Sequence, residues 1–158
     1  MDTTTTALDA LPVLNFLPEE VRRQVVASFE PASFGFGQTI VREGEPADGF
    51  YVLVSGRVRM VKLGENGDEI SLGSLRPGES FGESGLLGQA AHPATVRASS
   101  DVSLLRLDRA VFQQLLGQRS EVREYFELQA RHRHLQHFLR QFSTLNRLSP
   151  DALADLLR

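Results

Sequence analysis

Glycine is distributed very unevenly along this chain of 158 residues, and the pattern limits what the chain can fold into. Twelve of the 13 glycines lie between Glu30 and Arg109. The segments between them read as strands of about five to eight residues, with a turn signal about every ten residues, which is typical of an antiparallel barrel or sandwich. The strongest turn signal is Asn66-Gly67, because both residues tolerate a positive φ and favour a hairpin. We therefore expect a mostly β fold with an antiparallel β-barrel over about residues 30–109.

The predicted strand that ends at Pro77-Gly78 shows a regular alternation of residues. In "EISLGSLRPGE" the alternating order places Leu72 on one face of the strand and Leu75 on the other.

Helices are expected on both sides of the barrel. Before it, Pro18 suits a first helical position and two acidic residues follow, so we expect one or two short helices. Within the barrel region, Glu83–Leu87 reads as a single helical turn. After it, Asp108 is a plausible N-cap and Gly117 a plausible C′ residue of a helix, and a longer helix is expected from about Ser120 to Phe142. The apolar face of the first helical segment is formed by Leu14, Leu17, Val21, Val25 and Phe29.

The long C-terminal helix carries apolar and aromatic residues at alternating steps of three and four, the spacing of a heptad seam. This seam either packs on the barrel or forms a homodimer contact, and the sequence favours neither. Its members are Tyr125, Leu128, His132, Leu135, Leu139 and Phe142.

Composition and motifs exclude several classes of function. The chain has no cysteine, which excludes disulfides and thiolate metal sites and fits a reducing cytoplasm, our expected location. The net charge of -3 gives no general attraction to nucleic acid or to an anionic membrane, and no apolar run approaches the roughly 20 residues of a membrane span. In "RHRHLQH" only His134 and His137 have a metal-pair spacing, and we interpret this run, with Arg131 and Arg133, as a solvated basic face. No catalytic motif is visible, so we expect no enzyme and no metal cofactor.

The segment "FGESGLLGQAAHPATV", from Phe81 to Val96, has the composition of a phosphate site. A helical turn that begins after Gly82 offers free N–H groups and a positive dipole end to an anion. The Glu83 carboxylate is placed to accept a hydrogen bond from a sugar 2′-hydroxyl. The small residues Ala94 and Thr95 supply an amide and a hydroxyl as further donors.

These segments together resemble the cyclic nucleotide-binding domains found in the bacterial catabolite activator protein and in protein kinase A regulatory subunits. The resemblance covers residues 14–142 and is carried by "VREGEPADGFYVLVSGRVRM", "RPGESFGESGLL" and "ATVRASS". It implies a double-stranded β-helix, or jelly-roll, barrel. It also implies a regulatory module in which cyclic AMP or cyclic GMP in the barrel moves the C-terminal helix and an attached effector. The ligand-binding residues that it implies are Phe81, Gly82, Glu83, Ser84, His92, Pro93, Ala94 and Thr95.

The sequence departs from the family pattern at two adjacent positions. The phosphate-pairing arginine of the family falls on His92, and the next residue, Pro93, has no N–H to donate. A neutral imidazole lacks the two charge-assisted bonds of an arginine. Arg76 and Arg97 are the nearest candidates to compensate. Two interpretations stay open: a sensor that still binds nucleotide, and a non-binding homology domain that acts as a protein-interaction or dimerisation module.

The ends of the chain suggest how the domain is connected. We expect a flexible tail over residues 1–10, the domain itself over 11–142, and a linker with a terminal helix over 143–158. The last segment repeats the pattern that begins at Leu14, so it is either the start of a second copy or a helix that folds back. The chain is also similar to domains that precede peptidase-containing ABC exporters in bacteria, which implies a transporter as the effector. No DNA-recognition helix is visible.

Overall fold

In the part of the chain that the structure describes, eight antiparallel strands form two facing sheets, as expected for a jelly roll, rather than one continuously bonded barrel. The computed structural model describes residues 8, 14–15, 17–87 and 91–140. The first sheet has the order β1 (Glu30–Phe34), β8 (Val102–Asp108), β3 (Gly49–Ser55) and β6 (Ser80–Phe81). The second has the order β2 (Thr39–Val41), β7 (Thr95–Ala98), β4 (Val58–Leu63) and β5 (Glu69–Leu75). The predicted fold class is confirmed.

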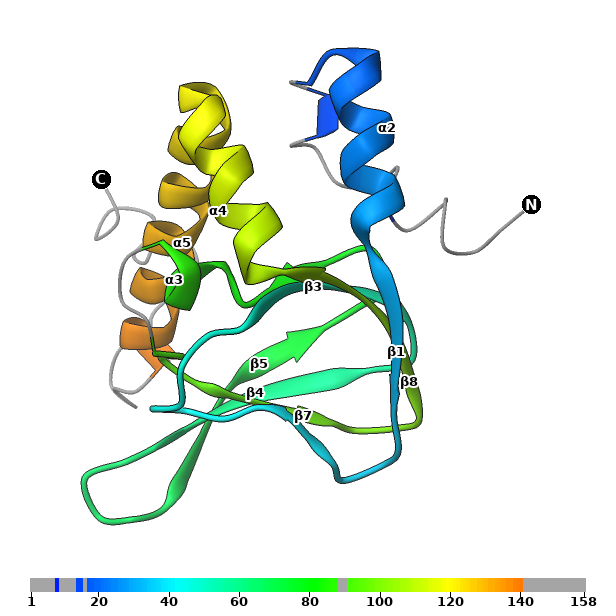
Figure 1. Cartoon of the computed structure of the whole chain (residues 1–158). Helices are drawn as coiled ribbons and strands as arrows, with labels where there is room; N and C mark the ends of the chain where they lie inside the picture. The colour runs from blue at the N-terminus through cyan, green and yellow to red at the C-terminus, as the bar shows by residue number, and fades with distance from the viewer. Residues whose placement is uncertain (1–7, 9–13, 16, 88–90, 141–158) are drawn as a thin grey trace, which may run out of the picture.

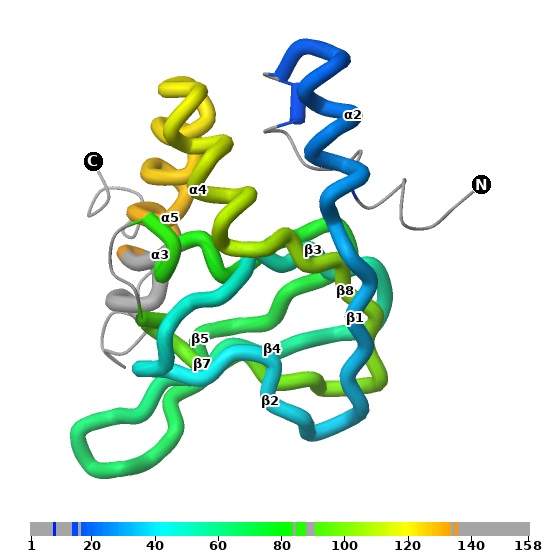
Figure 2. Tube along the Cα trace, viewed as in Figure 1, coloured from blue at the N-terminus to red at the C-terminus, as the bar shows by residue number. Residues whose placement is uncertain are grey.

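The described helices gather at one end of the two sheets, while the β4–β5 hairpin projects from the other end (Figure 1). None of them combines the length and the low polarity that crossing a bilayer would need. The short helix α3 lies beside α4 and α5 (Figure 2) and also contacts β3. The described helices are α2 (Glu19–Ser28), α3 (Glu83–Leu86), α4 (Arg109–Gln118) and α5 (Ser120–Arg140).

Strand β3 is buried on both faces because each face has its own apolar layer. Tyr51 and Leu53 point into the core between the two sheets, whereas Phe50 and Val52 point into the core under the helices. The ring of Phe50 lies 5.3 Å from that of Phe112 on α4 and 5.2 Å from that of Phe126 on α5. This aromatic cluster fixes α4 and α5 against the first sheet.

Two local expectations within the sheets and α4 were wrong. Leu72 and Leu75 are both buried, because a bulge opposite Met60 and Val61, at Gly73 with a φ of +127°, shifts the alternation of β5 by one residue. Gly117 is not the C′ residue of α4, since the helix continues to Gln118 and the Arg119 N–H bonds to the Leu115 carbonyl.

The N-terminal segment differs from expectation as well. Pro18 is the N-cap of α2 rather than its first helical residue. Leu8 lies in the stretch that we expected to be a flexible tail, yet it is buried in the core under the helices. The rest of that stretch lies outside the described residues, as do the linker and terminal helix expected over residues 143–158.

Candidate functional site

The candidate site begins where β6 ends, at Gly82. This residue has a φ of +99°, in the left-handed region that favours glycine. A Cβ atom on Gly82 would lie 2.7 Å from the carbonyl oxygen of Gly49 on β3. Close packing against β3 therefore requires a glycine at this position. The sequence had suggested only that the glycine lets the backbone approach a phosphate.

Glu83 follows as the first residue of α3, and its side chain is fully buried, with 0% exposed. Its Oε1 atom accepts a hydrogen bond of 2.9 Å from Nη1 of Arg133 on α5. The other terminal nitrogen of Arg133, Nη2, donates to the Ser80 carbonyl oxygen at 2.8 Å. Glu83 Oε2 is buried and has no hydrogen-bond partner. The site thus holds a buried, ion-paired carboxylate with one acceptor unused.

Arg133 is the functional candidate that sequence reasoning missed. We assigned it to a solvated basic face, but only 17% of its side chain is exposed. The available signal was its position two helical turns after Tyr125, on the same face of α5. Gln129 lies between them, and its Oε1 is buried without a hydrogen-bond partner. Burial, and secondarily the charge of Glu83, raise the pKa of Tyr125, so this face of α5 lies near the carboxylate.

His92, the residue at which the sequence resemblance places an arginine, is buried. Its backbone N–H donates to the Glu45 carbonyl and its carbonyl accepts from the Gly44 N–H, both at 2.9 Å. Burial lowers the pKa of His92 below its ordinary 6.5, although the carboxylates of Asp48 and Glu45 act in the opposite direction. The imidazole is therefore neutral near pH 7 and provides no permanent charge for a phosphate.

The other predicted binding residues lie in several different settings. Phe81 is buried and stacks on the ring of Tyr51, with centroids 5.0 Å apart. Ala94 is buried in the core between the sheets. The Thr95 hydroxyl accepts a 3.0 Å hydrogen bond from the Glu43 N–H. Pro93 is half-buried, and Ser84 is the second residue of α3. Their contact with a ligand stays a prediction.

Of the two arginines proposed to compensate for His92, Arg97 is paired with another residue. Arg97 alternates with the buried residues Val96 and Ala98, so it faces away from the core between the sheets. It forms two hydrogen bonds with the Glu69 carboxylate, at 3.1 and 2.9 Å. Arg76 is exposed on the loop before β6.

The predicted seam on α5 divides into buried and exposed parts. Tyr125 packs against the core under the helices. Leu128 is 61% exposed and Leu135 40% exposed, and His132 is also exposed. The side chain of Leu139, and the whole of Phe142, lie outside the part of the chain that the structure describes.

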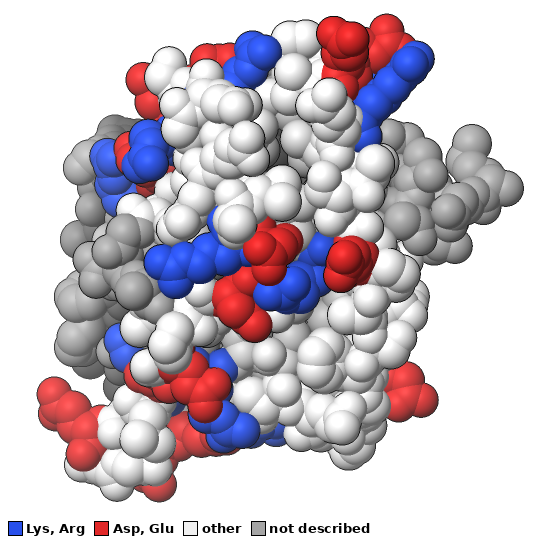
Figure 3. Space-filling view, in the orientation of Figure 1, with Lys and Arg blue, Asp and Glu red and all other residues white. Residues whose placement is uncertain are grey.

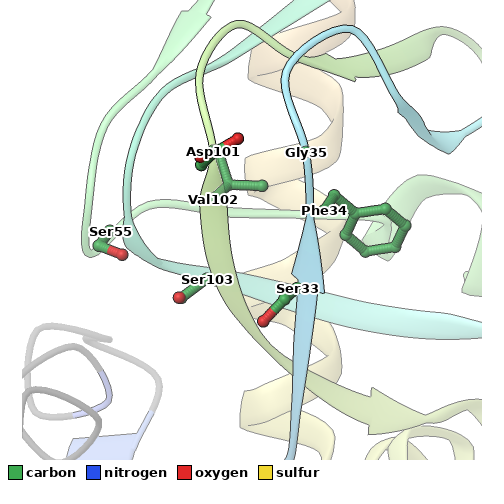
Figure 4. Close-up of a pocket in the computed structure, with 7 residues that line it drawn as sticks. All are labelled: Ser33, Phe34, Gly35, Ser55, Asp101, Val102 and Ser103. Atoms are coloured by element: carbon green, nitrogen blue, oxygen red, sulfur yellow. The ribbon is translucent and has the colours of Figure 1, made fainter.

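Other surfaces offer less to a ligand. An open cavity of about 440 Å³ lies at the far end of the first sheet, where β1, β3 and β8 meet (Figure 4). Its lining includes Ser33, Ser55, Asp101 and Ser103 and no residue of the Phe81–Val96 segment. Acidic and basic side chains are interspersed on the face in Figure 3, with no continuous patch of one sign. Among the described residues no three metal-ligating side chains converge, and the side chains of His134 and His137 are not among them.

Comparison with known proteins places this geometry in a family. The cyclic nucleotide-binding domain model matches residues 31–119. The cAMP-dependent protein kinase regulatory subunit of Hypocrea atroviridis is 37% identical over 110 residues, which are 70% of this chain and 23% of that protein. The corresponding subunit of Blastocladiella emersonii is 29% identical, over 73% of this chain and 28% of its own length. The chain thus spans about a quarter of the length of these curated relatives.

Solved structures agree with this assignment. The regulatory domain of Toxoplasma gondii PKA with cAMP superposes with a TM-score of 0.73 and 26% identity, over 80% of this chain and 48% of that one. The regulatory subunit of a cAMP-independent protein kinase A from Trypanosoma brucei gives a TM-score of 0.70 and 26% identity, over 82% and 45%. The family match covers more than half of the sequence, and the fold agrees with it. The chain belongs to the cyclic nucleotide-binding domain family.

Proposed function

We propose that this chain is a sensor module that binds a cyclic nucleotide, with cyclic AMP as the first candidate, and passes the binding event to an attached effector. One observation carries the proposal: the fully buried Glu83 carboxylate keeps Oε2 without a partner at the start of α3. A ribose 2′-hydroxyl is a neutral donor that can pair with such an acceptor. The cAMP-dependent regulatory subunits among the relatives support this choice of ligand.

Binding is expected to be weaker than in a site that carries the family arginine. His92 is neutral near pH 7, so the phosphate lacks a charge-assisted partner at this position. The loss of such a bond reduces affinity by roughly ten- to a hundredfold. A bound phosphate favours the protonated imidazole, so affinity should rise as the pH falls.

Isothermal titration calorimetry with cyclic AMP and cyclic GMP, at about pH 6 and pH 8, tests the proposal. We expect saturable binding that is tighter at the lower pH, and a gain of roughly tenfold or more in His92→Arg. His132→Arg, at an exposed position on α5, is the matched control and should bind like the wild type. The absence of binding heat in both the wild type and His92→Arg, at either pH, would contradict the proposal.

The signal is proposed to leave the site through α5, because this helix contacts α3 and supplies Arg133 to Glu83. A ligand that changes the position of α3 then changes the position of α5 and of whatever follows it. The sequence resemblance to domains that precede peptidase-containing ABC exporters makes such an exporter our candidate effector, acting from the cytoplasmic side.

A second candidate is an interaction module that dimerises without nucleotide. Leu128 and Leu135 favour it, because these large apolar side chains are exposed seven residues apart on α5. The similarity to a regulatory subunit of a cAMP-independent kinase is compatible with it. Analytical ultracentrifugation of the wild type and Leu135→Glu separates the candidates: a dimer that Leu135→Glu dissociates supports the second, and an unchanged mass excludes it.

A further inference from the structure

A lysine lies on the inner face of the second sheet. Val58 and Met60 of β4 are buried in the core between the two sheets, and Lys62 is the next residue on that side of the strand. The bulge in β5 leaves this order unchanged, because β4 pairs with β7 without a shift of register. Lys62 also lies opposite Ile70 of β5, which packs against the same core. The half-buried side chain of Lys62 is therefore on the interior side of the sheet.

This position brings Lys62 to the candidate site. The pairing of β4 with β7 ends with Val61 opposite Thr95. The next residue of β4, Lys62, is thus level with Ala94, which is buried in the same core. His92 comes two residues before Ala94 in the chain. A cationic side chain from β4 therefore lies beside the part of the segment at which the sequence resemblance expects an arginine.

The ammonium of Lys62 is not engaged by the protein. Lys62 forms no hydrogen bond and no ion pair with another described residue. Arg106, which follows Leu104 on the inward side of β8, is engaged: its Nη2 atom donates to the Asp48 carbonyl at 2.6 Å and lies 3.4 Å from a carboxylate oxygen of Asp108. A half-buried cation without a counter-charge is unfavourable, and an anionic ligand would supply that counter-charge.

The structure gives Lys62 no evident structural task. An inward-facing charge can protect a sheet edge from pairing with another chain. Strand β4 is not such an edge, because it lies between β7 and β5. Val58 and Met60 precede Lys62 on the same face, so an apolar residue would continue the pattern at lower desolvation cost. A residue that breaks the local pattern without a structural gain points to a functional role.

We propose that Lys62 binds the phosphate of the ligand and supplies from β4 the positive charge that His92 does not supply. This rests on the proposed function, because the phosphate is that of the cyclic nucleotide. An ammonium on a flexible stem acts as a point charge and lacks the fork of a guanidinium. The site then recognises the phosphate by its charge, without bidentate geometry.

Calorimetry with cyclic AMP and with adenosine, which lacks the phosphate, tests the proposal on the wild type, Lys62→Met, Lys62→Arg and Arg59→Met. The titrations are run at about pH 8, where His92 is neutral. Lys62→Met removes the charge but keeps an unbranched stem, so affinity for cyclic AMP should fall roughly ten- to a hundredfold while affinity for adenosine stays unchanged. Lys62→Arg should keep the affinity for cyclic AMP. Arg59, exposed on the opposite face of β4, is the matched control, and its variant should bind like the wild type.

Equal affinity of Lys62→Met and the wild type for cyclic AMP overturns the proposal, as does an equal loss for adenosine or in Arg59→Met. If the wild type does not bind cyclic AMP, the proposed function fails, and inorganic phosphate then judges Lys62 as an anion site. Thermal unfolding in increasing phosphate, at constant ionic strength, should show a larger rise in Tm for the wild type and Arg59→Met than for Lys62→Met. Equal rises in all three proteins overturn the proposal as well.

Discussion

Gly82 lies so close to the carbonyl oxygen of Gly49 that a Cβ atom on Gly82 would come within 2.7 Å of it. The obstacle is backbone rather than a flexible side chain, so neither partner can move without disturbing β3. Because Gly82 also has a φ of +99°, two separate constraints fix the turn that leads into α3. The orientation of Glu83, the next residue, depends on this turn.

Gly82→Ala is therefore expected to destabilise the protein by at least about 1–3 kcal/mol, the cost of a strained backbone conformation, with the contact to Gly49 adding to it. Urea unfolding measures the change. Gly117→Ala is the control, because Gly117 lies in α4 with a helical backbone and open space around it. This variant should gain up to about 1 kcal/mol. Similar effects at both positions would contradict the role assigned to Gly82.

The stability of the protein should depend on pH through His92. Its folded pKa lies below the ordinary 6.5, so between the two values the unfolded chain binds more protons than the folded protein. The contribution is complete above about pH 6.5 and is lost as the pH falls toward the folded pKa. His92→Gln should reduce the slope of unfolding free energy against pH in this window. The same slope in both proteins would contradict the prediction.

Asp108 joins β8 to α4 as a helix cap. Its Oδ2 atom accepts a 3.1 Å hydrogen bond from the Ala110 N–H, as the sequence predicted. Asp108→Ala should cost about 0.5–2 kcal/mol in urea unfolding. Asp108→Asn keeps a capping oxygen but removes the charge near Arg106, so it should stay close to the wild type. Equal losses in both variants would assign the effect to the charge.

Phe126 should contribute more to stability than any exposed residue of α5. Its ring lies 5.2 Å from that of Phe50 and 5.0 Å from that of Phe112. Phe126→Ala is expected to cost about 3–5 kcal/mol and to increase hydrogen exchange along α5. Leu128→Ala, at an exposed position on the same helix, should change stability by no more than about 0.5 kcal/mol. A small effect of Phe126→Ala would mean that α5 is not anchored through this cluster.

Local patterns predicted the fold well, because each depends on a few neighbouring residues. Asn66-Gly67 marked the β4–β5 turn, where Gly67 has a φ of +85°. Asp108 marked the start of α4. The alternation predicted for Leu72 and Leu75 was wrong because the bulge in β5 depends on its pairing with β4. The sequence of one strand alone does not contain that information.

The candidate site was predictable only in part, for a related reason. The family pattern pointed to Glu83 and His92 as ligand-binding residues, and this assignment stays a prediction. It gave no indication that Arg133, 50 residues after Glu83, is the counter-charge. A buried ion pair between distant segments leaves no local periodicity. The proposed role of Arg97 was wrong for the opposite reason. Arg97 is near His92 in the sequence, but its side chain bonds to Glu69 on the face of the second sheet that points away from the core.

The contact between α5 and Glu83 also decides where the domain can be cut. The family model ends at residue 119, one residue before α5 begins. A fragment trimmed to that boundary would expose the aromatic cluster and leave the Glu83 carboxylate without its counter-ion. Fragments made for expression or fusion should therefore include α5 to a point beyond Arg133. Shorter fragments would lack these contacts and would not represent the intact domain.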